Sequence, residues 1–207
     1  MIKVLTIERE YGSGAHDIAQ SVAERLGWKL WDQAMTDEIA RFLECDRRHV
    51  ERREERRDPL HYRLLKSFLH GSFEGSMNTP QVKIADAEGI RRVTERLVKQ
   101  AGAEGNAVIV GRGAAYYLHD LADAFHVFIY APFEEKVRRL QEEGKSQSEA
   151  MDLVENVDRD RTVFIKQHFG LDWPSRQFFH LMVNSTIGVD TAVETIANGM
   201  AALEKRR

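Results

Sequence analysis

Two glycines stand in the segment Glu8-Arg-Glu-Tyr-Gly-Ser-Gly-Ala-His16, between an apolar run and a helical pattern. Glycine lets the backbone turn tightly, so that successive N–H groups and the start of the following helix point at an anion. The match to the phosphate-binding pattern G-x-x-x-x-G-K-S/T is incomplete. With Gly14 as the second glycine, Arg9 stands at the first, Ala15 replaces the lysine and His16 replaces the hydroxyl that binds Mg²⁺. Taken alone, the segment fits a phosphate loop and a purely geometric turn equally well.

Two further polar residues stand just after apolar runs. Arg112 follows the run Ala107–Val110, which puts it at the carboxyl end of a strand, where doubly wound sheets bind ligands. There it would either grip a phosphate through its planar fork or lie in solvent at a helix start. Asp32 ends the run Trp28–Trp31. Its carboxylate would orient an acceptor, position Mg²⁺ or cap the following helix.

Asp158 and Arg161 lie three positions apart in a helical pattern, so they share one face of that helix. They form either a local ion pair or, together with Arg159, a source of guanidinium charge for a migrating phosphoryl group. The eight histidines show no H-E-x-x-H or comparable ligand spacing. We therefore expect no dedicated metal site.

The apolar pattern predicts the framework that must position these residues. Short β-branched or apolar runs predict five strands, at residues 3–7, 28–31, 107–110, 126–130 and 181–183. Helical periodicity follows residue 15, with Gly27 at the C-cap, and returns at 84–100, 133–143, 146–168 and 189–203. Strands that alternate with helices predict an α/β fold with a doubly wound parallel sheet.

Composition and charge narrow the class of protein. The chain has 207 residues, a formal net charge of -3 and one cysteine, Cys45, which excludes a disulfide framework and a multi-cysteine metal site. Its apolar runs are far shorter than the roughly 20 residues that span a bilayer, and its first ten residues do not read as a signal peptide. We expect a cytoplasmic protein without a membrane partner. In residues 47–57 arginines alternate with glutamates, which favours a solvated helix face over a nucleic-acid contact.

Several segments, in order over nearly the whole chain, resemble the bacterial cytidylate kinase-like family. The first, from Thr6 to Ala15, resembles the family's S-R-E-Y-G-S-G-G sequence, which takes the place of a standard Walker A loop. The others are Trp31-Asp32, Val108–Gly113, Val127–Pro132, Asp158–Arg161 and Val183–Ser185. Residues 41–86 carry little of the likeness. The pair Ala15-His16 departs from the Gly-Arg or Gly-Lys that family members often carry after the last loop glycine.

The resemblance implies a P-loop NTPase-like kinase fold and transfer of the ATP γ-phosphoryl group, with Mg²⁺, to a nucleoside monophosphate. CMP or dCMP is the first acceptor that it suggests. We expect one domain over residues 1–207, with a helical insertion at about 35–105 covering the acceptor site. The donor phosphates would lie on the loop residues Gly12, Ser13, Gly14, Ala15 and His16.

The same resemblance assigns roles to the other candidates. Arg159 and Arg161 would stabilise the transferred charge, while Asp32, Arg112 and Asp158 would hold the acceptor. Arg112 matches the arginine of the D-G-R-D segment of cytidylate kinases, which contacts the acceptor nucleotide. Two other functions stay open. One is a nucleotide-binding regulatory protein that has lost catalysis with its Walker lysine, and the other is a kinase of a different small acceptor on the same fold.

Overall fold

A computed structural model describes residues 1–32, 34–35, 38–39 and 87–206. The Arg/Glu-rich segment 47–57, the start of the helix expected from residue 84 and most of the expected insertion at 35–105 lie outside these residues. Five strands form one parallel sheet in the order β2-β3-β1-β4-β5. They are β1 (Val4–Arg9), β2 (Lys29–Trp31), β3 (Ala107–Val110), β4 (Ala124–Tyr130) and β5 (Leu181–Asn184). The predicted parallel α/β sheet is confirmed.

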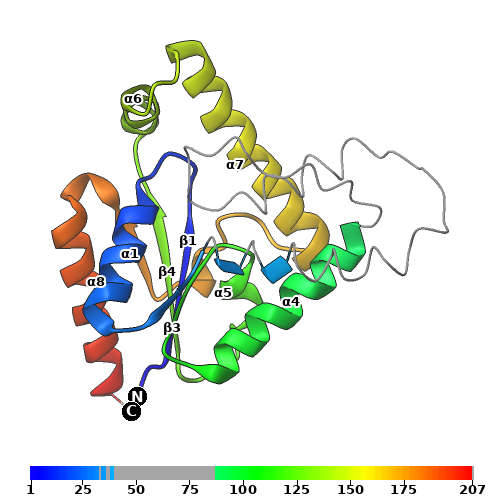
Figure 1. Ribbon diagram of the computed structural model, residues 1–207, viewed down its shortest axis with the longest axis vertical. Helices are drawn as coiled ribbons and strands as arrows, with labels where there is room; N and C mark the ends of the chain where they lie inside the picture. The colour runs from blue at the N-terminus through cyan, green and yellow to red at the C-terminus, as the bar shows by residue number, and fades with distance from the viewer. Residues whose placement is uncertain (33, 36–37, 40–86, 207) are drawn as a thin grey trace.

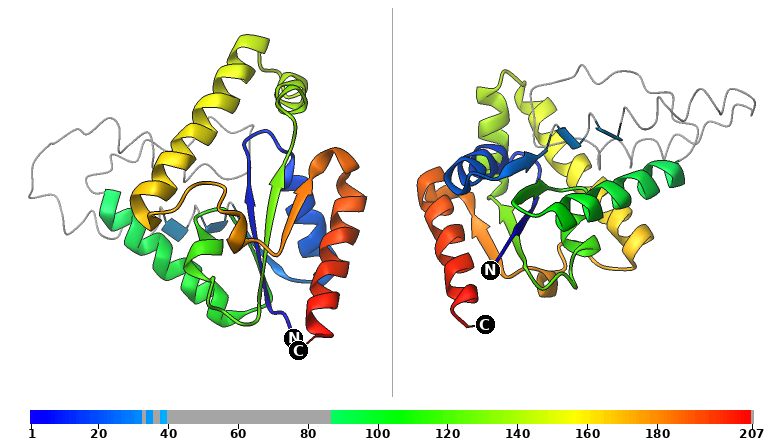
Figure 2. Two further views of the ribbon diagram at one scale, coloured as in Figure 1. Left: turned by 180° about the vertical axis from the view of Figure 1, so that it is seen from behind. Right: turned by 60° about the horizontal axis from the view of Figure 1, so that its bottom comes forward.

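Helices cover both faces of the sheet and one of its ends (Figures 1 and 2). One face carries α1 (Ala15–Leu26) and α8 (Val189–Glu204), and the other carries α4 (Ala87–Glu104) and the short α5 (Ala114–Tyr117). Two more helices, α6 (Phe133–Glu142) and α7 (Gln147–Phe169), stand at the end where β1 and β4 finish. Two short 3-10 turns, Arg176–Phe178 and Ser185–Ile187, flank β5. The strand ends, the first loop and the α6–α7 pair therefore meet at one edge of the sheet.

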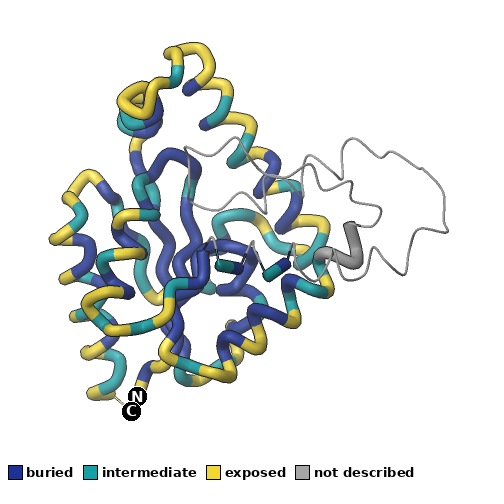
Figure 3. Tube along the Cα trace, viewed as in Figure 1, coloured by how far each residue is buried: buried dark blue, intermediate teal, exposed yellow. Residues whose placement is uncertain are grey.

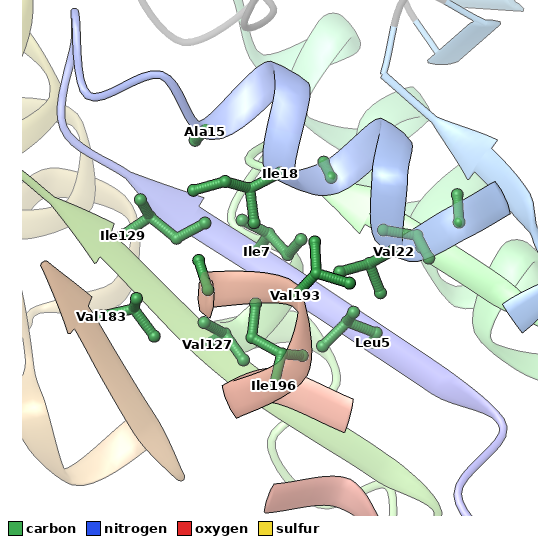
Figure 4. Close-up of a cluster of buried hydrophobic side chains, with 14 of the residues drawn as sticks. Leu5, Ile7, Ala15, Ile18, Val22, Val127, Ile129, Val183, Val193 and Ile196 are labelled. Carbon is green, nitrogen blue, oxygen red and sulfur yellow. The ribbon is translucent and has the colours of Figure 1, made fainter. Parts of the chain in front are cut away.

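Each face of the sheet buries its own apolar cluster. Leu5 and Ile7 of β1, with Val127 and Ile129 of β4, pack against α1 and α8, as Figure 4 shows. On the opposite face, β3 and α5 pack against Leu97, Val98 and Ala101 of α4, so the C-terminal part of the expected insertion is a helix that covers the sheet. Figure 3 shows the buried strands running between exposed outer helix faces. This packing fixes the strand ends that carry the candidate residues.

Helix α1 begins and ends at glycines in the left-handed conformation. Gly14 is its N-cap, with φ 69°, and makes no side-chain cap hydrogen bond. Gly27 is the C-cap, with φ 64°, and its N–H reaches the carbonyl oxygens of Ala23 and Glu24. The predicted C-cap glycine is confirmed. The start of α1 therefore lacks the side-chain cap that usually accepts from first-turn N–H groups.

Strand β1 is longer than the sequence pattern predicts. The apolar run ends at Ile7, but pairing with β4 continues through Glu8 opposite Phe128 and Arg9 opposite Ile129. Both charged side chains are buried, so charge misled the prediction of where the strand ends. No helix among the described residues is long and apolar enough to cross a membrane.

Candidate phosphate-binding site

The loop between β1 and α1 is a tight turn over residues 10–14. Gly12 and Gly14 have φ of 72° and 69°, a region that L side chains rarely adopt. The hydroxyl of Ser13 donates to the carbonyl oxygen of Glu10 at 2.7 Å, which closes the turn. The loop thus delivers the uncapped N-terminus of a 12-residue helix, and the partial positive charge there suits an anion.

Helix α7 fastens this loop from one side through the predicted D-x-x-R pair. Asp158 Oδ1 accepts the backbone N–H of Tyr11 at 2.8 Å and an N–H of Arg161 at 3.1 Å. The same Nη1 of Arg161 donates to the carbonyl oxygen of Arg9 at 3.0 Å. Burial raises the pKa of Asp158, while Arg161 and Lys136 act to lower it. Asp158 and Arg161 therefore form a local ion pair, and their hydrogen bonds to the backbone of Tyr11 and Arg9 also hold α7 against the loop.

Lys136 of α6 reaches the same loop, and sequence reasoning missed it. Its Nζ lies 2.9 Å from Glu10 Oε2 and 3.4 Å from Asp158 Oδ2. Lys136 as a whole is only 7% exposed. A Cβ added to Gly12 would lie 3.1 Å from the Cβ of Lys136. A side chain at position 12 would therefore push against α6. The aliphatic stem of Lys136 packs on the loop backbone while its ammonium sits between two carboxylates.

Arg139, one turn further along α6, holds the other end of the loop. Its Nη1 donates to the carbonyl oxygen of Ser13 at 2.6 Å and to the hydroxyl of Ser185 at 2.9 Å. A Cβ added to Gly14 would lie 2.9 Å from the same Nη1. A side chain at position 14 would therefore displace the end of the Arg139 guanidinium from the Ser13 carbonyl, in addition to straining the backbone. In the sequence, Lys136 and Arg139 sit in the charged stretch E-E-K-V-R-R, which reads as a solvated face. The sequence feature that could have identified them is their position next to Val137 and Leu140, the buried apolar residues of α6.

A buried cluster of charge lies beside the loop at the ends of β1, β2 and β3. It comprises Glu8, Arg9, Asp32 and Arg112, and Arg161 adds its charge from α7; all are less than about a tenth exposed. Burial, with repulsion from Arg161, lowers the pKa of Arg9 and of Arg112 to about 10, against the attraction of Asp32 and Glu8. Burial raises the pKa of Glu8, against its arginine neighbours. With Asp158, which pairs with Arg161, three guanidinium groups face three carboxylates, so the buried arginines are balanced by protein carboxylates.

Arg112 occupies a strained backbone position. It has φ 60° and stands between Gly111 and Gly113, with φ of 64° and 66°. Left-handed backbone costs a residue with a Cβ about 1–2 kcal/mol, and such strain concentrates at ligand-binding positions. The side chain is 1% exposed. A side chain at Gly111 would collide with the guanidinium of Arg9, so the two arginines lie together at the ends of neighbouring strands.

His16 joins the loop to the end of β2. Its Nδ1 lies 3.2 Å from Oδ2 of Asp32, whose side chain is 4% exposed. Arg159, by contrast, is on the exposed side of α7, where it bonds to Asn156 of the same helix. The structure therefore brings together the predicted residues of the loop, Asp32, Arg112, Asp158 and Arg161, and does not bring Arg159 to them. Within the described residues no group of three or more His, Cys, Asp or Glu side chains could hold a metal ion.

A parallel sheet with a glycine loop leading from β1 into α1 defines the class of P-loop kinase folds, and solved structures share this architecture. A protein of Eubacterium ventriosum matches with a TM-score of 0.68 at 19% identity, covering 97% of this chain and 99% of its own. The shikimate kinase of Bacteroides thetaiotaomicron matches with a TM-score of 0.52 at 14% identity, covering 96% and 98%. That of Acinetobacter baumannii, solved with shikimate, gives 0.51 at 15%, covering 100% and 96%. At these identities the likeness shows the fold alone.

Within that class, the chain belongs to the cytidylate kinase-like family, whose model matches residues 4–187. Among curated proteins, a cytidylate kinase of Ignicoccus hospitalis is 29% identical over 104 residues, which are 49% of this chain and 60% of that protein. The match thus spans less than two thirds of the relative. The predicted family is confirmed, and kinase-family membership supports a nucleotide kinase-like function.

Proposed function

We propose that this protein transfers the γ-phosphoryl group of ATP to a nucleoside monophosphate, with CMP or dCMP as the first acceptor. The proposal rests on family membership and on one observation. The glycine loop, at the start of α1 that no side chain caps, lies beside a buried cluster that gathers the guanidinium groups of Arg9, Arg112 and Arg161. Donor and acceptor phosphates are both anions, and a helix start and arginine side chains are groups that bind anions.

On the donor side, the backbone N–H groups of residues 12–16 would hold the ATP phosphates. The observations that fit this group are the crowded glycine positions and the uncapped helix start. Mg²⁺ usually keeps several waters and binds through substrate phosphates with one or two carboxylates. It would therefore arrive with ATP, where it neutralises phosphate charge, and a cage made only of protein ligands is not needed.

On the acceptor side, Arg112 would grip the acceptor phosphate and Asp32, fixed by His16, would orient the acceptor. Asp158 was expected there too. Its two oxygens accept from Tyr11 and pair with Arg161 and Lys136, so we assign it to positioning the loop and Arg161. Arg159 points away from the loop, and we place the charge that stabilises transfer on Arg161.

The transfer step needs positioning and charge rather than a covalent residue. An acceptor phosphate oxygen forms the new bond to the γ-phosphorus as the bond to the β-phosphate oxygen breaks, which yields ADP and a nucleoside diphosphate. Negative charge spreads over the migrating group, and Arg161 is a buried guanidinium held beside the loop by Asp158 and by the carbonyl oxygen of Arg9. Preorganised charge of this kind stabilises the transition state without reorganisation.

A coupled assay of ADP release tests the proposal with Mg-ATP and a panel of CMP, dCMP, UMP, AMP and GMP. We expect turnover with CMP or dCMP in preference to AMP or GMP. Arg161→Ala should lower kcat by about 10²-fold, the usual scale for one preorganised charge, with a smaller effect on ATP affinity. Arg159→Ala is the matched control on the same helix and should retain turnover.

Two results would refute it. ATP binding without turnover of any acceptor would favour the regulatory alternative, in keeping with Ala15 and His16 in the loop. Turnover only with a non-nucleotide acceptor, such as a small hydroxy acid, would favour a kinase of another substrate on the same fold.

A further inference from the structure

The loop lacks the lysine that normally brings a positive charge to the phosphates, because Ala15 stands at that position. Three cations from other elements contact loop atoms or loop side chains in the described structure. Arg161 comes from α7, and Lys136 and Arg139 come from α6. The partners of each cation decide which of the three can most easily exchange a protein contact for a ligand.

Both arginines are engaged by fixed backbone. Arg161 donates to the carbonyl oxygen of Arg9, and Arg139 donates to the carbonyl oxygen of Ser13. A phosphate that recruited either Nη1 would leave a backbone carbonyl without its donor, which is costly at a buried site. Arg161 would therefore act on the migrating group through its charge and its other N–H groups, while its Nη1 keeps its backbone partner. These bonds hold the loop in its conformation.

Lys136 is engaged differently. Its ammonium contacts the side-chain carboxylates of Glu10 and Asp158, and Glu10 is the more exposed of the two, at 24% against 16%. Glu10 Oε2 also accepts the backbone N–H of Ala131, but at 3.4 Å this bond is longer than those of the two arginines. The Glu10 carboxylate can therefore swing into water at a smaller cost, and a phosphate can then take its place. An ammonium has three donors on a flexible stem, so it can keep Asp158 while it exchanges Glu10.

The position of the stem completes the argument. The Cβ of Lys136 would lie 3.1 Å from a Cβ at Gly12, and the backbone oxygen of Lys136 would lie 3.2 Å from it. Helix α6 therefore packs closely against the loop at Gly12, two residues before Gly14, the N-cap of α1.

We infer that Lys136 supplies, from α6, the ammonium charge that a standard P-loop carries on its own lysine, and that Glu10 holds this charge until phosphate displaces it. The inference rests on the proposed function only in its choice of ATP as the ligand. The ammonium would contact the donor phosphates, so it would act on ATP binding and on transfer together. Its place on the helix that follows β4, rather than on α1, ties phosphate binding to the docking of α6 on the loop.

Lys136→Met tests the charge, because methionine preserves most of the stem. We expect ATP affinity, measured by titration calorimetry, to fall by about tenfold or more, the effect of one hydrogen bond to a charged group. Turnover should fall by about 10²-fold, and Lys136→Arg should retain part of both. Arg138→Met is the matched control, since Arg138 lies on the same helix with 54% of its side chain exposed, and it should match wild type.

Two further variants separate a ligand contact from a structural ion pair. Glu10→Gln frees the ammonium and should tighten ATP binding, whereas a purely structural pair predicts weaker binding in a less stable protein. The double variant Lys136→Met/Ala15→Lys returns a lysine to the standard place and should recover ATP affinity without recovering the lost stability in urea unfolding. Wild-type ATP affinity in Lys136→Met would overturn the inference. If wild type binds ATP but turns over no acceptor, the proposed function fails while these affinities still decide the role of Lys136.

Discussion

The carboxylate of Asp158 accepts the backbone N–H of Tyr11 at 2.8 Å, across 147 positions of sequence. This bond joins the middle of α7 to the loop that follows the first strand. Lys136 and Arg161 pair with the same carboxylate. One side chain therefore holds together three elements at the end of the sheet.

Removal of Asp158 should destabilise the fold. Asp158→Ala leaves Lys136 and Arg161 without one of their counter-charges and the Tyr11 N–H without its acceptor. Breaking a buried pair by removing one partner costs about 3 kcal/mol or more, even though burial alone raises the pKa of Asp158. Urea unfolding measures the change. Asp152→Ala, at an exposed position on α7, should change the free energy of unfolding by less than about 0.5 kcal/mol, and equal effects would contradict the assignment.

Gly14→Ala should abolish ATP-dependent thermal stabilisation. The new Cβ would meet Nη1 of Arg139 at 2.9 Å and disturb the loop at the start of α1. Gly27→Ala is a close control, because Gly27 caps the other end of α1 with a φ of 64° and has no atom within 4 Å of an added Cβ. Both substitutions carry the left-handed strain of about 1–2 kcal/mol. Only Gly14→Ala should remove the ligand-dependent shift in Tm, and loss of the shift in both variants would mean that strain alone is responsible.

Arg112→Lys should weaken acceptor binding and spare ATP. The substitution keeps the charge and the backbone conformation but removes the planar fork that grips a phosphate through two bonds. We expect CMP affinity, measured by titration calorimetry, to fall about tenfold or more. Equal losses for CMP and ATP would show that Arg112 does not belong to one subsite.

His126 should make stability fall in mild acid. Burial, followed by repulsion from His180 and His119, lowers its pKa from 6.5 to about 4, and its Nδ1 lies 2.7 Å from the hydroxyl of Thr6. The unfolded chain binds the proton more readily, so the contribution of neutral His126 is fully present above pH 6.5 and is lost as the pH falls toward 4. The difference corresponds to roughly 3 kcal/mol.

Urea unfolding between pH 7 and pH 4.5 measures that loss. His126→Gln should flatten the dependence on pH, whereas His119→Gln, at a half-exposed residue, should keep most of it. An unchanged slope in His126→Gln would assign the effect to other groups.

The sequence predicted the framework well because its strands are short apolar runs between turns. It singled out the loop, Arg112, Asp158 and Arg161, which the structure brings together, because each stands at a strand end or at a regular helical spacing. It missed the charge inside the sheet, since Glu8 and Arg9 read as the start of a loop although they pair with β4. It also missed Lys136, because one buried lysine in a charged helix looks like its solvated neighbours until the packing of α6 on Gly12 is known.

Because of the left-handed backbone at Arg112, selection for stability and selection for function favour different residues at that position. Glycine there would relieve about 1–2 kcal/mol of strain, but it would leave Asp32 and Glu8 without one of their counter-charges. A library in which positions 8, 32 and 112 vary together, sorted only for thermal stability, should therefore drift toward glycine or asparagine at position 112 with neutral residues at the other two. The same library sorted for growth dependent on phosphoryl transfer should return arginine. The difference in the free energy of unfolding between the variants that the two selections return would measure how much stability the protein gives up for its function.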